Sequence, residues 1–259
     1  ALNGRSGQRY SAGVSGTLIT GSAIHYGYYM PFGLLTPASW VALFTRRYMH
    51  LTGCTQDALF EIAQATRDYA VRNPAAFFYQ RPMTRADYDA GKKICNPLTL
   101  YDCCQESDGG CAIVVTTPER ARHLKQPGVS IRGVAQCIAK DQEEMTSFYR
   151  PDIARIPEMD LAADEAYAQC GLSAQDIDAA VIYDAFTPIV LWQLESWGFC
   201  GRGEAKDFVK GGNLDKDGGL PCNTHGGQLS EAYIHGMNGV NEGVRLIRGT
   251  SLNQPRKND

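Results

Sequence analysis

Short apolar runs alternate with helix start signals through the second part of this chain, from about residue 107 onward. Continuous apolar runs of this length are typical of strands buried on both faces of a parallel sheet. They occupy residues 111–116, 129–138 and 177–182. Capping residues and helical spacing predict helices over residues 157–170, 189–197 and 226–248. The alternation predicts an α/β fold with largely parallel, buried strands.

The part of the chain before residue 107 has helix signals instead. Thr36 followed by Pro37 is an N-cap and first-turn pair, and Thr84 with Asp87 forms a capping-box pattern. These signals and the apolar spacing predict helices over residues 36–51, 55–73 and 84–92.

Composition excludes several classes of function. The 259 residues are 44% hydrophobic and 20% charged, with a formal net charge of -3. Basic residues are scattered, whereas nucleic acids and anionic membranes need a concentrated cationic face. No apolar run approaches the length of a membrane span, and the N-terminus has no signal-peptide core. We expect neither a nucleic-acid partner nor a membrane span.

The nine cysteines include no Cys-x-x-Cys pair, which argues against a zinc or dithiol site, so no metal is expected. Their odd number and apolar surroundings are typical of reduced thiols, so we expect a cytoplasmic protein. Cys103 and Cys104 form a tempting nucleophile pair. No histidine lies near them in sequence and a buried strand is expected to follow, so catalysis there is disfavoured.

Two segments have the features of a site in an open α/β sheet, where ligands bind beyond strand ends and at helix starts. In residues 181–187, polar Tyr183 and Asp184 follow an apolar strand. In residues 223–239, glycines precede a predicted helix, where backbone amides could hold an oxyanion.

These two segments resemble motifs of the thiolase superfamily. Glycines 226, 227, 236 and 239 are in register with a glycine-rich thiolase block, and Tyr233 takes the place of its catalytic histidine. Tyr183 matches the first residue of the thiolase Asn-Glu-Ala-Phe motif, and Phe186 matches the last. With tyrosine at both polar positions, the chain resembles a narrower group, the lipid-transfer-protein-type steroid aldolases. The runs at residues 33–40, 183–188 and 224–228 strengthen this match.

The resemblance implies a layered αβαβα thiolase-like fold, incomplete at both ends because the thiolase segments that carry the catalytic cysteines have no counterpart here. Residues 1–125 would be the remainder of the N-terminal half, with a loop and helical insertion, and residues 126–259 the C-terminal half.

The implied reaction is a retro-aldol cleavage in sterol degradation. A 17-hydroxysteroid with a short acyl-CoA side chain would give a 17-ketosteroid and propionyl-CoA. Tyr183 would be the base toward the carbinol and Tyr233 the acid toward the enolate, with the exchanged assignment as the alternative. A phenol is a weak base near neutral pH but a competent proton donor.

Substrate-binding residues are expected around the tyrosines. Asn223 is a candidate donor to the thioester oxygen, and Gly226 and Gly227 would let the thioester approach the backbone. For His225 and His235, a direct role in substrate binding and a structural role are equally open. His235 lies two residues beyond Tyr233, so it should face another side of the predicted helix. His25 and Tyr26 fit a steroid pocket or, equally well, a dimer interface.

The same resemblance implies a homodimer and a partner subunit with an OB-fold and a zinc ribbon. No cofactor is expected, because CoA enters as part of the steroid acyl-CoA substrate. Three alternatives remain: a sterol-carrier-type thiolase (acetyl-CoA acyltransferase), a non-catalytic lipid-transfer or scaffold protein, and, more weakly, a condensing synthase.

Overall fold

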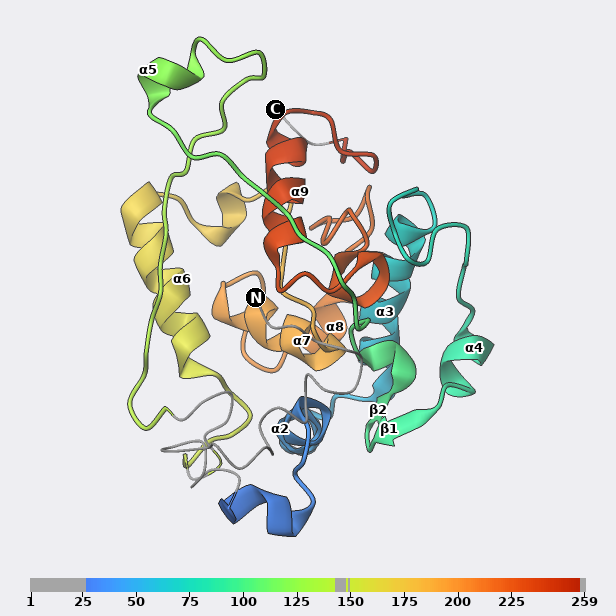
Figure 1. Cartoon of the computed structure of the whole chain (residues 1–259). Helices are drawn as coiled ribbons and strands as arrows, with labels where there is room; N and C mark the ends of the chain where they lie inside the picture. The colour runs from blue at the N-terminus through green and yellow to red at the C-terminus, as the bar shows by residue number, and fades with distance from the viewer. Residues whose placement is uncertain (1–26, 143–147, 149, 257–259) are drawn as a thin grey trace.

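The structure, a computed structural model, describes residues 27–142, 148 and 150–256 (Figure 1). His25 and Tyr26 lie outside the described residues. The helices are η2 (Met30–Phe32), α2 (Pro37–Thr52), α3 (Gln56–Ala70), α4 (Arg85–Asp89), η3 (Leu100–Asp102), α5 (Pro118–Ala121), α6 (Pro157–Cys170), η4 (Ala174–Asp176), α7 (Thr187–Ser196), α8 (Ala205–Phe208), the π-helical turn η5 (Gly227–Glu231) and α9 (Met237–Ile247). The strands are β1 (Lys93–Cys95) and β2 (Leu98–Thr99).

Helix α7 lies at the centre of the molecule, with α3, α6 and α8 packed against it (Figure 1). Its sequence is mostly apolar with no distinct polar face, and every residue of the helix except Gln193 and Ser196 is buried. Leu191 and Leu194 are fully buried in the core cluster, and each such side chain stabilises the fold by about 1.5–3 kcal/mol. Residues 182–186, which lead into α7, are therefore held against the core.

The predicted helix boundaries in the first part of the chain are largely confirmed. Thr36 and Ser39 form a capping box at the start of α2, and Gly53 ends the helix in the left-handed conformation. Thr84 and Asp87 cap α4 in the same way. Helix α6 begins at Pro157 and ends before left-handed Gly171, as predicted.

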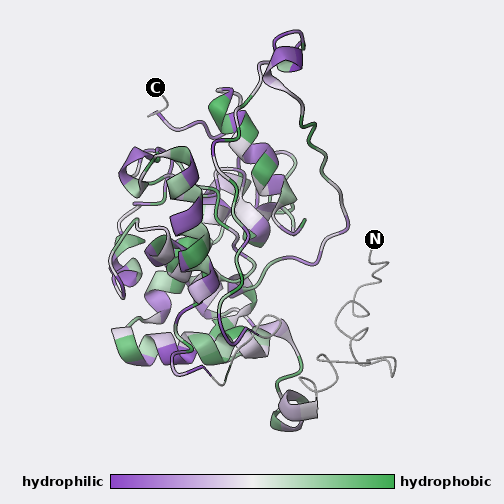
Figure 2. Cartoon of the chain, turned by 90° about the vertical axis from the view of Figure 1, so that its left-hand side faces the viewer, coloured by the Kyte–Doolittle hydropathy of each residue, from purple (hydrophilic) through white to green (hydrophobic). Residues whose placement is uncertain are grey.

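The prediction of buried strands at residues 111–116 and 129–138 is wrong for the described structure. Both runs are extended, but neither forms a strand, and Val114 and Ile138 are 87% and 79% exposed. Figure 2 shows them as long segments that lead to and from α5, with hydrophobic stretches along them. A strand is buried only when neighbouring strands pair with it, and β1 with β2 is the one sheet in the described residues.

The third predicted strand, at residues 177–182, forms only a short parallel contact. The Ala180 amide donates to the Pro221 carbonyl oxygen at 2.9 Å, and the Asn223 amide donates to the Ala180 carbonyl oxygen at 3.0 Å. This contact aligns the two segments that were predicted to carry the site. The predicted division of the chain at residue 125 stays a prediction.

Candidate active site

Tyr183 directly follows the parallel contact and is half-buried. Its backbone is held to α7, because Gln193 Nε2 donates to the Tyr183 carbonyl oxygen at 2.6 Å. Gly236 lies against the ring: a Cβ at that position would be 3.3 Å from Tyr183 Cδ2, and the backbone there is left-handed with φ +85°. Gly236 therefore leaves room for the ring where a larger residue would press on it.

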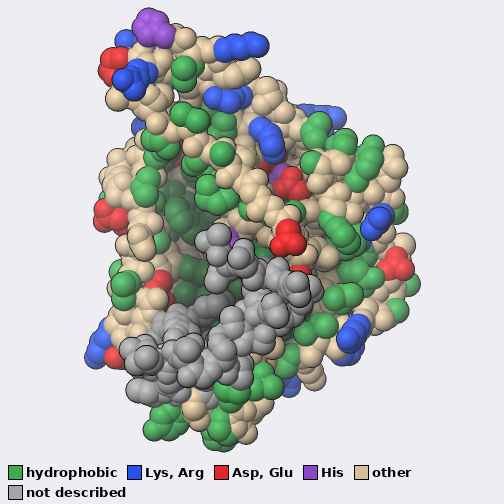
Figure 3. All heavy atoms as spheres, viewed as in Figure 1, with side chains coloured by type: hydrophobic (Ala, Val, Ile, Leu, Met, Phe, Trp, Pro, Cys, Tyr) green, Lys and Arg blue, Asp and Glu red, His purple; other side chains and the backbone are tan. Residues whose placement is uncertain are grey.

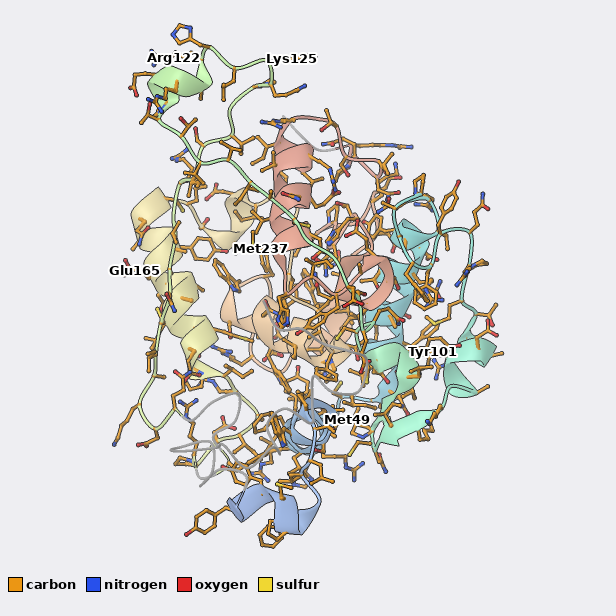
Figure 4. The ribbon with its side chains drawn as sticks, in the orientation of Figure 1. Met49, Tyr101, Arg122, Lys125, Glu165 and Met237 are labelled. Atoms are coloured by element: carbon orange, nitrogen blue, oxygen red, sulfur yellow. The ribbon has the colours of Figure 1, made fainter. Side chains whose placement is uncertain are left out.

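Tyr233 lies in the loop 232–236, between η5 and α9. Its backbone amide donates to Ser107 Oγ at 3.1 Å. Met237, the first residue of α9, is labelled in Figure 4 and marks the end of this loop. The predicted single helix over 226–248 is wrong here, because left-handed Gly226, Gly227 and Gly236 interrupt it.

The two tyrosine hydroxyls meet: Tyr183 Oη and Tyr233 Oη are 2.7 Å apart, a hydrogen bond in which either can donate. Their ring centroids are 6.2 Å apart. Tyr233 Oη is also 3.3 Å from His235 Nδ1, and these two rings are 4.6 Å apart. His235 has φ +49°, so it is not on a helix, and the expectation that it faces away from Tyr233 is wrong. Tyr183, Tyr233 and His235 form one cluster.

Asp184, beside Tyr183, connects the segment 180–183 to the left-handed turn at Gly226 and Gly227, the glycine turn. Its carboxylate accepts from the Gln228 amide at 2.7 Å and the Leu229 amide at 3.4 Å. Complete burial raises the pKa of Asp184 to about 7, against these hydrogen bonds and one from Asn223, which lower it. A Cβ on Gly227 would be 1.9 Å from Asp184 Oδ2, so only glycine allows the approach.

Two predicted binding residues, Asn223 and His225, directly precede this turn in the chain. Asn223 is buried, and its Oδ1 accepts from the Ile182 amide at 2.8 Å, which strengthens the parallel contact. His225 is 2% exposed, with no hydrogen-bond partner for either ring nitrogen. Burial lowers the pKa of His225 to about 3, so the ring is neutral. Neither side chain joins the tyrosine cluster, and the binding roles of Asn223, His225, Gly226, Gly227 and His235 stay predictions.

Sequence reasoning gave no role to Ser107 or Gln228, both of which contact the loop 232–236. The signal available was the position of Gln228 inside the motif segment 224–228 and of Ser107 just before Gly109 and Gly110, because polar residues next to glycines are candidates for backbone support. Cys103 was considered and disfavoured as a nucleophile. Burial raises the pKa of its thiol, which opposes formation of a thiolate.

Within the described residues, no group of three or more His, Cys, Asp or Glu side chains could hold a metal ion. Across residues 27–142, 148 and 150–256, no helix combines the length and hydropathy needed to cross a bilayer. In the view of Figure 3 the molecule is hollowed beside α6, and hydrophobic side chains line the hollow.

Comparison with known proteins supports the resemblance. The model of the thiolase C-terminal domain-like family matches residues 139–258. A steroid side-chain-cleaving aldolase of Thermomonospora curvata is 56% identical over 98% of this chain. A 17-hydroxy-3-oxo-4-pregnene-20-carboxyl-CoA lyase of Mycobacterium tuberculosis is 51% identical over 98% of the chain. The chain spans 66% of the length of each of these relatives.

A solved structure described as an Ltp2-ChsH2(DUF35) aldolase is 56% identical and superposes with a TM-score of 0.90. The superposition covers 93% of this chain and 64% of that one. The predicted thiolase-like fold is thereby confirmed. With the matched family model and these identities, the chain belongs to the thiolase superfamily.

Proposed function

We propose that this chain carries the acid–base centre of a carbon–carbon lyase that cleaves the side chain of a 17-hydroxysteroid acyl-CoA thioester. The observation that carries the proposal is the 2.7 Å contact between the hydroxyls of Tyr183 and Tyr233. The names of the aldolase of T. curvata and the lyase of M. tuberculosis support the reaction class and the substrate.

The reaction moves one proton from oxygen to carbon. The C17 hydroxyl loses its proton, the C17–C20 bond breaks, and its electron pair forms the enolate of the thioester. Protonation of that enolate at C20 gives propionyl-CoA, and C17 becomes a ketone. Neither an oxidant nor an acyl-enzyme is required, so the chemistry needs one proton acceptor and one proton donor.

Two phenols in contact can accept the carbinol proton and donate a proton to the enolate without forming a free phenolate. Tyr183 accepts the carbinol proton while its own proton passes to Tyr233, and Tyr233 delivers its proton to C20. Both hydroxyls are neutral again at the end of the step. This relay removes the difficulty that a lone phenol is a poor base near neutral pH. It preserves the roles expected from the sequence, Tyr183 as base and Tyr233 as acid.

We also infer the surroundings of the substrate. The hydrophobic hollow in Figure 3 suits the apolar faces of a steroid. A second subunit and a homodimer are part of the proposal; the description of the solved relative, which names two components, supports the second subunit. The OB-fold and zinc ribbon of that subunit rest on the family resemblance alone.

The test is the full-length protein with its partner subunit, incubated with the hydroxylated steroid-CoA, with ketosteroid and propionyl-CoA measured by mass. Tyr183→Phe and Tyr233→Phe should each lower the cleavage rate by about 10²- to 10⁴-fold, because each removes one member of the relay. Tyr167→Phe is the matched control, since it removes a half-buried hydroxyl that donates to the Trp197 carbonyl oxygen at 3.0 Å.

Near-normal cleavage by both phenylalanine variants would refute the assignment. The rivals give other results. A thiolase would release product only with free CoA as acceptor, and a scaffold protein would bind the steroid-CoA without releasing propionyl-CoA.

A further inference from the structure

Gln228 is bonded to both tyrosine-bearing segments. It belongs to η5 and is 2% exposed, so each polar atom of its side chain must be satisfied within the protein. Its backbone amide donates to Asp184 Oδ1 at 2.7 Å, and Asp184 is the neighbour of Tyr183. The backbone of Gln228 is therefore fixed to the segment that carries one of the two hydroxyls.

The side chain of Gln228 holds the other segment. Its Oε1 accepts from the Ile234 amide at 3.0 Å and from the Gly236 amide at 3.3 Å. These two amides flank His235, and Ile234 is the residue after Tyr233. One carbonyl oxygen thus fixes the loop on both sides of His235.

The orientation of the Gln228 amide is set by a buried network. Asn238 Nδ2 donates to Glu231 Oε2 at 2.8 Å and to the Ala232 carbonyl oxygen at 3.0 Å. These two bonds fix the orientation of the Asn238 amide, so its Oδ1 faces Gln228. Gln228 Nε2 donates to that oxygen at 2.8 Å. Because its nitrogen is committed there, its oxygen must face the loop.

The loop needs this support. His235 is in the left-handed conformation, φ +49°, which a residue with a side chain adopts only where its surroundings enforce it. If the loop relaxed, the Tyr233 ring would move relative to Tyr183, whose own position is fixed by α7 and Asp184. The 2.7 Å contact between the hydroxyls would then lengthen.

We propose that Gln228 is a positioning residue that sets the Tyr183–Tyr233 hydroxyl contact, an inference that rests on the proposed lyase function. Gln228 acts through the backbone of the loop 232–236. Its loss should therefore slow the proton relay more than it weakens substrate binding.

Gln228→Met tests this in the full-length protein with its partner subunit. Methionine is of similar length and has neither the amide oxygen nor the amide nitrogen. We expect kcat for cleavage to fall about 10²-fold, with KM close to that of wild type. Gln254→Met is the matched control, because Gln254 also accepts from a backbone amide, that of Ser251, and donates to a backbone carbonyl, that of Leu246, outside the site.

Gln228→Glu adds a rescue experiment. A protonated glutamic acid presents one donor and one acceptor, as glutamine does, whereas the ionised form has only acceptors and faces Asn238 Oδ1. The ratio of its kcat to that of wild type should therefore rise as the pH falls. Gln228→Met has no titrating group, so its ratio should stay constant. A general loss of packing would not give this pH-dependent recovery.

A second readout separates this inference from the proposed function. In protein labelled at the tyrosine ζ-carbon, Tyr183→Phe should shift the Tyr233 resonance, because the hydroxyls share a hydrogen bond. In the Gln228→Met background that shift should disappear. If wild type does not cleave the steroid-CoA, the proposed function fails and this readout still tests positioning. If wild type cleaves, and Gln228→Met keeps its kcat and the resonance shift, the inference is overturned.

Discussion

Replacement of the buried His225 by phenylalanine should change how the stability of the protein depends on pH. His225 is 2% exposed and both its ring nitrogens are without hydrogen-bond partners. Burial, with a smaller contribution from Arg245, lowers its pKa from 6.5 to about 3. In the unfolded chain the ring takes up a proton at its ordinary pKa, and in the folded protein it does not. Acidification therefore stabilises the unfolded state.

The sign and size follow from that difference. The contribution of a neutral, buried histidine to stability is complete above its unfolded pKa of 6.5 and is lost progressively as the pH falls toward about 3. Between about pH 7.5 and about pH 5 the loss amounts to about 2 kcal/mol. Below about pH 3 the folded protein is also protonated, so the loss stops growing.

His225→Phe removes this component and keeps an aromatic ring at the same buried position. The assay is urea unfolding of wild type and variant across this pH range, with free energies obtained by linear extrapolation. The stability of wild type minus that of the variant should fall by about 2 kcal/mol between about pH 7.5 and about pH 5.

An ion pair with Glu231 would give the opposite result. Glu231 Oε2 is 3.8 Å from His225 Nε2, too far for a hydrogen bond. Both Glu231 oxygens already accept, from Asn73 at 3.0 Å and from Asn238 at 2.8 Å. We therefore infer a neutral ring. A difference that grows on acidification would show a protonated, paired histidine and would refute this reasoning, and a flat difference would show that the ring is not sequestered from water.

Two further predictions concern the glycine turn. Gly227→Ala should lower the free energy of unfolding by about 2–4 kcal/mol, because its methyl group would lie 1.9 Å from Asp184 Oδ2. Gly211→Ala is the control, with φ +66° and nothing within 4 Å, so equal costs in urea unfolding would rule out the steric explanation. Asp184→Asn tests the raised pKa of Asp184, about 7 against an ordinary 3.8. The folded protein holds this proton through that window, so the stability of wild type relative to Asp184→Asn should fall as the pH rises from about 4 to about 7. A constant difference in unfolding free energy would mean that the carboxyl is ionised throughout.

The helix ends could be predicted because their causes are local. The Thr36–Ser39 and Thr84–Asp87 capping boxes join residues three apart, and the left-handed Gly171 ends α6 by its own backbone freedom. In each case the residues that make the contact are neighbours in the sequence. A pattern of that kind can therefore be recognised from the sequence alone.

Strands are different, because an apolar run gives no information about its partner. Residues 111–116 have the composition of a buried strand, yet Val114 and Val115 are 87% and 71% exposed. Residues 177–182 have a similar pattern, and their end is buried because residues 221–223 pair with them. The difference lies in a partner elsewhere in the chain, which no single segment reveals.

The candidate site combines features that could be predicted from the sequence with features that could not. The register of the motifs located Tyr183 and Tyr233, but their contact depends on the pairing of Ala180 with Cys222, which brings the segment that carries Tyr183 beside the glycine turn. The place of His235 was predicted wrongly, because a continuous helix was assumed across Gly226, Gly227 and Gly236, all of which are left-handed.

A glycine permits both helical and left-handed backbone, and only the atoms around it decide between them. Here the deciding atoms are the Asp184 carboxylate, which leaves no space for a Cβ on Gly227, and the Gln228 amide, which holds the loop on both sides of His235. The residue types therefore predict which tyrosines belong to the candidate site, whereas the contact between them depends on hydrogen bonds between residues far apart in the chain.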